Sequence, residues 1–205
     1  MRVVVLGAAG QLGREVVSAL VARGNTMCAA VRRPPDPPLP GSVEIRIADA
    51  RSRSEIRRAM SGFDAVVNVI GGGTLRRNDV ASTTSAAAVA AAQDARVQRY
   101  FAMSAGMVAL DWLLFRHVLR PLIFRHILAE HRRVEEIVKA SAPAWTIVRP
   151  SALTNHPARG YEASLELQRR AFMTTRADVA AFIGDELKGN KYVRQAVFIA
   201  SRRAH

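Results

Sequence analysis

Three glycines have the spacing that a phosphate-binding turn requires. Gly7, Gly10 and Gly13 follow the apolar run 3–6 and open the segment 11–23, which we predict to be a helix. In such a turn the first glycine allows the bend, the second lets the backbone approach a pyrophosphate, and the third lets the helix pack close to the strand. The helix start then presents unpaired N–H groups to the anion. We predict a dinucleotide site; a purely structural glycine turn is the alternative.

Two arginines predict which dinucleotide binds. Arg32 and Arg33 follow directly after the second apolar run, 26–31. A fold that selects NAD usually has a carboxylate there, on the ribose 2′-OH, whereas arginine suits a 2′-phosphate. No carboxylate lies between Glu15 and Asp36. The sequence therefore favours NADPH over NADH, and a solvated charged turn is the alternative.

The elements that must position these residues alternate along the chain. Short apolar runs predict strands over 2–6, 26–31, 43–47, 65–70, 98–103, 145–149 and 196–200. Helical patterns cover 11–23, 53–60, 79–95, 111–140 (with a break) and 177–187. This alternation indicates an α/β fold, a Rossmann-like doubly wound parallel sheet with helices on both faces. The proline-rich stretch 34–40 cannot pair in a sheet and predicts a stiff surface loop.

Composition bounds the class of protein. A chain of 205 residues predicts a single domain, 1–205, with a small C-terminal region on the substrate side. The net charge of +13 comes mostly from scattered arginines, which does not favour a nucleic-acid partner. The lone Cys28 and the histidine spacing predict no disulfide framework and no metal. Because no apolar run has transmembrane length, we expect a cytoplasmic protein.

Two segments carry no chemical motif. In 107–128 an apolar sequence is interrupted by Arg116 and Arg120, and Pro121 must end or kink any helix. Such a segment can cover a substrate cleft, form the face of a homodimer, contact a membrane or pack as an ordinary helix. We expect 107–128 and 154–168 to form the substrate side or a subunit interface, and we expect no membrane contact.

Further motifs resemble those of the atypical short-chain dehydrogenase/reductases. The closest match is the NAD(P)H-binding, NmrA-like branch that includes biliverdin reductase B and flavin reductase. The similarity covers nearly the whole chain. Besides the glycine loop it rests on Ser104, Glu130-His131-Arg132-Arg133-Val134-Glu135, Trp145-Thr146-Ile147-Val148-Arg149-Pro150 and Thr175-Arg176-Ala177-Asp178-Val179-Ala180. The order and spacing of these motifs are more specific than any one of them.

The resemblance implies NADPH/NADP as the cofactor and a set of residues that bind it. Asp49 and Ala50 match a pair that contacts adenine, and Val69 to Gly72 match the turn beneath the cofactor ribose. The loop after 145–149 is expected to support the nicotinamide. The full implied set is Gly7, Ala9, Gly10, Gln11, Leu12, Gly13, Arg32, Arg33, Asp49, Ala50, Val69, Gly71, Gly72, Ser104, Pro150, Ser151 and Ala152.

The chain departs from the family's conventional members in its proton donor. Those members use Tyr-x-x-x-Lys, but none of the three tyrosines here is followed by lysine at the fourth position. Ile127 and His131 stand where the pair aligns. Ser104 and His131 are therefore the candidate catalytic residues. Ser104 would donate a hydrogen bond to the acceptor oxygen, and His131 would supply a proton, since its reference pKa of about 6.5 suits neutral pH.

The absence of the Tyr-x-x-x-Lys pair also limits which substrates the protein could reduce. Reduction of an isolated carbonyl needs a proton donor for the developing alkoxide, whereas a conjugated acceptor spreads the charge itself. We predict an NADPH-dependent reductase of a conjugated or aromatic small molecule, such as a quinone, flavin or polyketide-like acceptor. Two alternatives stay open: a non-catalytic NADP(H)-sensing regulatory protein, and an NADP-binding epimerase or lyase-like enzyme.

Overall fold

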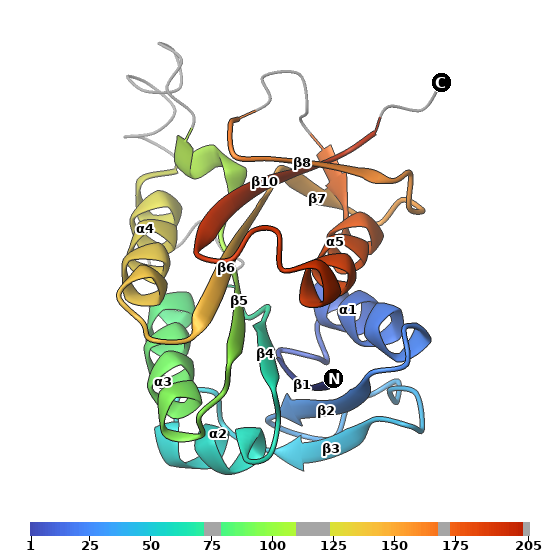
Figure 1. Ribbon diagram of the computed structural model, residues 1–205, viewed down its shortest axis with the longest axis vertical. Coiled ribbons are helices and arrows are strands. Elements are labelled where there is room, and N and C mark those ends of the chain that lie inside the picture. The colour runs from blue at the N-terminus through green and yellow to red at the C-terminus, as the bar shows by residue number, and fades with distance from the viewer. Residues whose placement is uncertain (72–78, 110–123, 168–172, 203–205) are drawn as a thin grey trace.

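A computed structural model describes residues 1–71, 79–109, 124–167 and 173–202. Its centre is an eight-stranded sheet in the order β3-β2-β1-β4-β5-β6-β10-β8 (Figure 1). The strands are β1 (Arg2–Leu6), β2 (Thr26–Val31), β3 (Glu44–Ile47), β4 (Ala65–Asn68), β5 (Arg99–Met103), β6 (Ala144–Pro150), β8 (Tyr161–Ser164) and β10 (Gln195–Ser201). The chain reverses its winding between β1 and β4, which are parallel neighbours. In an open α/β sheet this reversal marks the ligand crevice.

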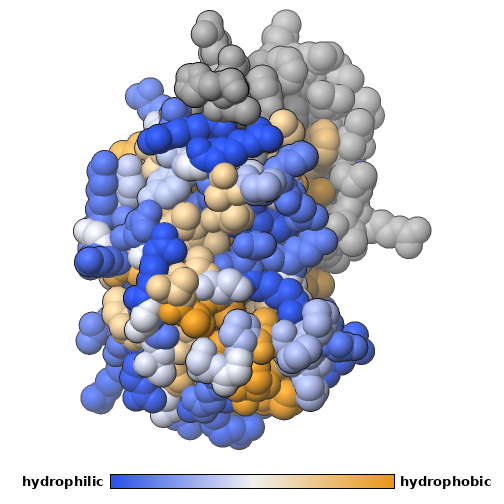
Figure 2. Space-filling view, turned by 90° about the vertical axis from the view of Figure 1, so that its right-hand side faces the viewer, coloured by the Kyte–Doolittle hydropathy of each residue, from blue (hydrophilic) through white to orange (hydrophobic). Residues whose placement is uncertain are grey.

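Helices cover both faces of the sheet (Figure 1). On one face lie α1 (Gln11–Ala22) and α5 (Arg176–Gly189), and on the other α2 (Arg53–Met60), α3 (Val80–Asp94) and α4 (Arg125–Lys139). A short 3-10 helix, η1 (Gly106–Ala109), follows β5. Figure 2 views the molecule from the side of Figure 1 where α1 and α5 lie, and shows a mostly hydrophilic surface with a hydrophobic area in its lower part.

Local sequence explains the two elements that build the crevice. The valines of β1 and Leu6 are buried, as expected for a central strand with helices on both faces. In α1, Leu12, Val16 and Leu20 recur every four residues and are buried against the sheet. The alanine-rich α3 buries side chains small enough for it to lie closely between α2 and α4.

The start of α5 explains the role of one motif residue. Thr175 caps the helix by accepting the N–H of Asp178 at 3.0 Å. The Asp178 carboxylate accepts the N–H groups of Arg159 and Gly160 and the hydroxyl of Ser201. This buried carboxylate therefore ties the loop before β8 and the end of β10 to α5, which is a structural role.

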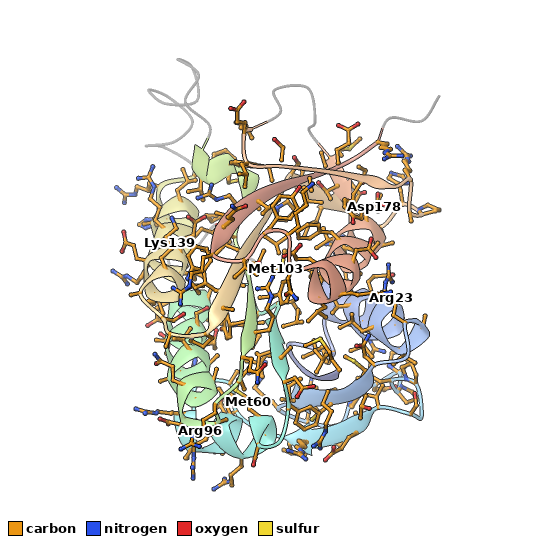
Figure 3. The ribbon with its side chains drawn as sticks, in the orientation of Figure 1. Arg23, Met60, Arg96, Met103, Lys139 and Asp178 are labelled. Atoms are coloured by element: carbon orange, nitrogen blue, oxygen red, sulfur yellow. The ribbon has the colours of Figure 1, made fainter. Side chains whose placement is uncertain are left out.

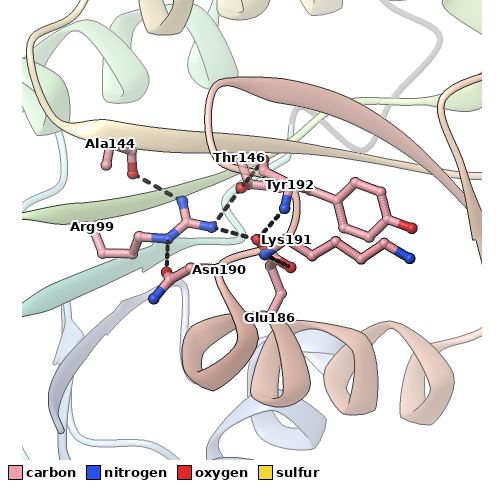
Figure 4. Close-up of polar contacts among 7 residues, drawn as sticks. All are labelled: Arg99, Ala144, Thr146, Glu186, Asn190, Lys191 and Tyr192. Carbon is pink, nitrogen blue, oxygen red and sulfur yellow. Dashed lines mark hydrogen bonds and ion pairs between the residues drawn. The ribbon is translucent and has the colours of Figure 1, made fainter.

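The amino edge of the sheet is held by a buried ion pair (Figure 4). Arg99 at the start of β5 and Glu186 in α5 lie 2.8 Å apart, and their side chains are only 5% and 3% exposed. The guanidinium also donates hydrogen bonds to Ala144 O, Thr146 Oγ1 and Asn190 Oδ1. Glu186 accepts the N–H groups of Lys191 and Tyr192. Both charges are thus satisfied far from the carboxyl ends of the parallel strands.

The predicted α/β architecture is confirmed, with additions. All predicted strands form within a few residues of the expected bounds. The sheet is not wholly parallel, because β8 pairs antiparallel with β10. This strand and a separate parallel pair, β7 (Ala152–Thr154) with β9 (Met173–Thr175), were not predicted. The helix expected over 111–140 is described only as α4, and residues 110–123 of the segment 107–128 lie outside the described residues.

No helix in the described parts of the chain is long and apolar enough to cross a membrane. The same residues hold no group of three His, Cys, Asp or Glu side chains arranged for a metal ion. Cys28 is buried in β2, and its burial raises the pKa of the thiol to about 11. This thiol is therefore protonated and unreactive at neutral pH.

Candidate active site

A cavity of about 640 Å³ opens at the carboxyl ends of the central strands. Its wall combines the glycine loop, the ends of β4, β5 and β6, the first half of α4 and the start of α5. The lining residues are Gly7, Gly10, Gln11, Leu12, Gly13, Val69, Gly71, Met103, Ser104, Ala105, Met107, His126, Ile127, Glu130, His131, Pro150, Ser151, Ala152, Leu153 and Arg176. The cavity thus lies where the reversal of winding predicts a ligand crevice.

The three glycines of the loop have three different roles. Gly7 has a φ of +83°, which other residues rarely adopt. At Gly13 a Cβ atom would lie 2.2 Å from Gly7 O and 2.7 Å from Ala8 Cα, so glycine is needed for packing. At Gly10 a Cβ atom would contact only Gly7 O, at 3.3 Å. The fold therefore does not require a glycine at position 10, and the space beside this residue is part of the cavity.

The start of α1 has the features of an anion-binding site. The N-cap residue Gly10 provides no side-chain cap, and the first turn contains no acidic residue. The N–H groups of Gln11 and Leu12 have no hydrogen-bond partner among the described residues. These donors and the positive end of the helix dipole line the cavity. The glycine loop therefore fits the pyrophosphate of a dinucleotide.

An arginine joins the glycine loop to the proline-rich loop. The Arg14 guanidinium donates to the carbonyl oxygens of Ala9, Pro37 and Pro38. In the sequence, the predicted pair Arg32 and Arg33 lies between these two loops, directly after β2. Both residues are exposed, and neither guanidinium has a hydrogen bond or ion pair among the described residues. Their charges are thus available to a ligand at this edge.

The turn after β4 is shaped by a buried amide. Asn68 Oδ1 accepts the N–H of Ile70 at 3.1 Å, and its Nδ2 donates to Tyr100 Oη at 3.1 Å and Ser85 Oγ at 3.4 Å. These bonds fix the bend that brings Val69 and Gly71 to the cavity. The predicted residue Gly72 lies outside the described residues.

Ser104 is part of a buried charged cluster. Its hydroxyl donates to Glu135 Oε1 at 2.8 Å. Arg149 binds the same carboxylate with two hydrogen bonds, of 2.8 and 2.6 Å, and Lys139 donates to Oε2 at 3.1 Å. Burial acts to raise the pKa of Glu135, but the hydrogen bonds from Arg149 and Ser104 lower it overall. Glu135 is therefore ionised, and it accepts the Ser104 proton that the sequence analysis assigned to a ligand.

The second catalytic candidate has an unsatisfied nitrogen. His131 lines the cavity, and its buried Nδ1 atom has no hydrogen-bond partner among the described residues. Burial lowers the pKa of His131 below its usual value, although Glu135 and Glu130 act to raise it. The ring is neutral at pH 7, so it offers one N–H rather than an imidazolium. Glu130, beside it, accepts the Ser82 N–H and hydroxyl at the start of α3.

The rest of the cavity is mainly apolar. Four apolar side chains line it: Met103 at the end of β5, Met107 in η1, Ile127 at the start of α4 and Leu153 in β7. Figure 3 labels Met103 near the centre of the molecule. Arg176, at the start of α5, adds one positive charge, and its guanidinium donates to Asn155 Oδ1 at 2.6 Å. Such a wall suits an apolar ligand surface with few polar groups.

Comparison with known proteins decides the family. The sequence profile of the NAD(P)H-binding family matches residues 7–189. The chain belongs to this family. YhfK of Bacillus subtilis (strain 168), an uncharacterized sugar epimerase, is 30% identical to this NAD(P)H-binding protein over 190 residues, 88% of this chain and 85% of YhfK.

Solved structures share the fold of this NAD(P)H-binding protein. The oxidoreductase ylbE of Lactococcus lactis has a TM-score of 0.84 at 18% identity, covering 100% of this chain and 92% of its own. A short-chain dehydrogenase/reductase of Veillonella parvula DSM 2008 in complex with NADP has a TM-score of 0.80 at 18% identity, covering 100% and 96%. At these identities the likeness extends to the fold alone.

The structure brings most of the predicted site residues of this NAD(P)H-binding protein to one cavity. They are Gly7, Gly10, Gln11, Leu12, Gly13, Val69, Gly71, Ser104, His131, Pro150, Ser151 and Ala152. Ala9, Arg32, Arg33, Asp49 and Ala50 are not among the lining residues; they follow β1, β2 and β3 at the same carboxyl edge.

Two charged residues beneath the cavity were not predicted as part of the site. Glu135 shares a helical stripe with Leu128, His131 and Val138, and a carboxylate on such a stripe is a signal of a buried polar contact. Arg149 is the one charged residue in β6. Each residue stood within a recognised motif, but the sequence did not show that the two side chains meet.

Proposed function

We propose that the protein is an NADPH-dependent reductase that transfers hydride to a flat, conjugated small molecule such as a flavin or quinone. Gly7, Gly10 and Gly13 with the free N–H groups of α1 would hold the pyrophosphate. The turn at Val69–Gly71 would lie beneath a ribose, and the loop from Pro150 would support the nicotinamide. When bound, NADPH supplies the hydride.

The preference for NADPH is supported by Arg32 and Arg33. Both side chains are exposed at the end of β2 without a partner among the described residues, and no acidic residue occupies this turn. A charge-assisted contact to the 2′-phosphate strengthens binding by about 1.5–3 kcal/mol, which is roughly ten- to a hundredfold in affinity. Asp49 and Ala50, after β3, would contact the adenine.

The choice of a conjugated acceptor rests on the protonation states of the side chains in the cavity, which are the main support for this proposal. Ser104 donates its proton to ionised Glu135, and burial keeps the His131 ring neutral. Neither group is a strong acid at neutral pH. An isolated ketone would therefore lack a donor for its developing alkoxide, whereas a flavin or quinone spreads the added charge over its rings. The apolar wall of Met103, Ile127 and Leu153 fits such rings.

A second function is favoured by the sequence relative. YhfK is named as a sugar epimerase, and an epimerase of this class would use NADP without net consumption. The apolar acceptor side of the cavity argues against a sugar, whose hydroxyl groups need polar partners. A sensor without catalysis would bind the cofactor and reduce nothing.

One experiment separates the three functions. Purified protein is mixed with NADPH and, in turn, with flavins, quinones and simple ketones, and separately with NADP⁺ and nucleotide sugars. Oxidation of NADPH only with the conjugated acceptors supports the reductase. Conversion of a sugar without net reduction of NADP⁺ supports the epimerase, and cofactor binding without any turnover supports the sensor. The Gly10→Val variant is the control for contaminating reductases, because it should lose the activity.

A further inference from the structure

The cluster around Ser104 bears on which acceptors the cavity recognises. Glu135 is almost fully buried, yet four donors surround its two oxygens: two from Arg149 and one each from Lys139 and Ser104. A carboxylate has about four acceptor sites, so Glu135 is saturated. Figure 3 shows Lys139 on α4, the helix that also carries Glu135.

The saturation fixes the orientation of one hydroxyl. If Ser104 rotated to donate its proton to a ligand, the buried carboxylate would lose a donor, and unsatisfied buried charges are unfavourable. A hydroxyl carries one proton and two lone pairs. With its proton held by Glu135, the Ser104 oxygen can offer the cavity only lone pairs.

We propose that Glu135 is a positioning residue that makes Ser104 a hydrogen-bond acceptor, so that the cavity selects ligands presenting an N–H or O–H group to it. The proposal deepens the reductase function, on which it rests for the choice of probes. Among conjugated acceptors it favours those with a ring N–H, such as flavins, or a ring hydroxyl, over fully alkylated rings of the same shape.

A positioning role of Glu135 can be distinguished from a merely structural role, because the chain contains a second buried carboxylate that serves as a matched control. Glu186 is, like Glu135, a buried carboxylate paired with an arginine, but it lies at the amino edge of the sheet (Figure 4). Glu186→Gln breaks a comparable ion pair without touching Ser104. Loss of stability is expected from both glutamine variants, whereas loss of ligand discrimination is expected only from Glu135→Gln.

The test uses two pairs of probes that differ by one methyl group: riboflavin and N3-methylriboflavin, and a hydroxyquinone and its methoxy ether. Dissociation constants are measured with NADP⁺ present, and KM and kcat with NADPH. In the wild-type protein the donor-bearing member of at least one pair should bind about tenfold more tightly, with kcat changed less than KM. Ser104→Ala and Glu135→Gln should abolish this preference, whereas Ser104→Thr and Glu186→Gln should retain it.

Each outcome decides the proposal. Equal binding of both members of both pairs by the wild type, or binding of none of the four probes, overturns it. A preference that also disappears in Glu186→Gln shows a structural effect and overturns it as well. If the binding preference follows the expected pattern while no probe oxidises NADPH, the positioning role stands and the reductase function fails.

Discussion

Replacement of Gly10 by valine should separate folding from cofactor binding. Gly10 has φ −75° and ψ 166°, a backbone conformation that valine adopts readily. A Cβ atom there would meet only Gly7 O, at 3.3 Å, and would otherwise project into the cavity. The added side chain would therefore occupy the space that a pyrophosphate needs.

The two effects differ in size. Loss of two charge-assisted hydrogen bonds to a phosphate is worth about 3–6 kcal/mol, a fall of roughly 10²–10⁴-fold in affinity. The poorer N-cap destabilises the fold by about 1 kcal/mol, or roughly 2–4 °C in Tm for a chain of this size. Gly13→Ala is the matched control. Its Cβ atom would lie 2.2 Å from a backbone oxygen, and overpacking by about 3 kcal/mol lowers Tm by roughly 6–12 °C.

The assay combines thermal unfolding with calorimetric titration of NADPH. Gly10→Val should melt close to the wild type and show no measurable binding at concentrations that saturate the wild type. Gly13→Ala should show the larger loss of Tm. Retained affinity in Gly10→Val would refute the reasoning, because it would mean that no phosphate lies beside this residue.

Three further predictions concern charged groups. In calorimetric titration, the double variant Arg32→Ala/Arg33→Ala should bind NADPH about ten- to a hundredfold more weakly than the wild type, with the same affinity for NADH. An equal loss of affinity for both cofactors would contradict the contact to the 2′-phosphate. Glu186→Gln leaves Arg99 as a buried unpaired charge, which should lower the free energy of unfolding by about 3–5 kcal/mol in urea titration. The NADPH affinity should not change. An unaltered urea midpoint would contradict this prediction. Because the pKa of His131 is lowered in the folded protein, its contribution to stability is present above the unfolded pKa of about 6.5 and is lost as pH falls below it. Urea midpoints of the wild type should therefore fall more steeply below that pH than those of His131→Gln, and parallel curves would count against the shift.

Most of the sheet could be predicted because its strands are locally distinctive. The apolar run of β1 is buried on both sides and needs no tertiary information to be recognised. The Tyr161–Ser164 segment of β8 alternates Tyr161 and Ala163 with polar residues, but over only four positions. Such a short pattern does not predict a strand before the pairing with β10 is known. The three-residue strands β7 and β9 are similarly defined by each other. Such pairings depend on distant segments and leave little trace in the local sequence.

The site divides in the same way. The glycine loop could be predicted because a tight turn followed by a closely packed helix imposes a local spacing on Gly7, Gly10 and Gly13. The contact between Glu135 and Arg149 could not, because it depends on how α4 packs against β6. The neutral state of His131 also follows from burial, which the reference pKa does not include. The sequence thus predicted which residues line the cavity better than it predicted their hydrogen bonds and protonation.

The Arg99–Glu186 pair has a consequence for how this chain can evolve. It links β5, β6 and α5 at the amino ends of the strands, opposite the cavity, so these contacts do not depend on the residues that line the cavity. Mutations of the cavity-lining residues Met103, Ile127 or Leu153 would leave this distant ion pair intact, which helps to keep the protein above its stability threshold. A lineage with such an anchor can explore new substrates without first acquiring compensating mutations in its core.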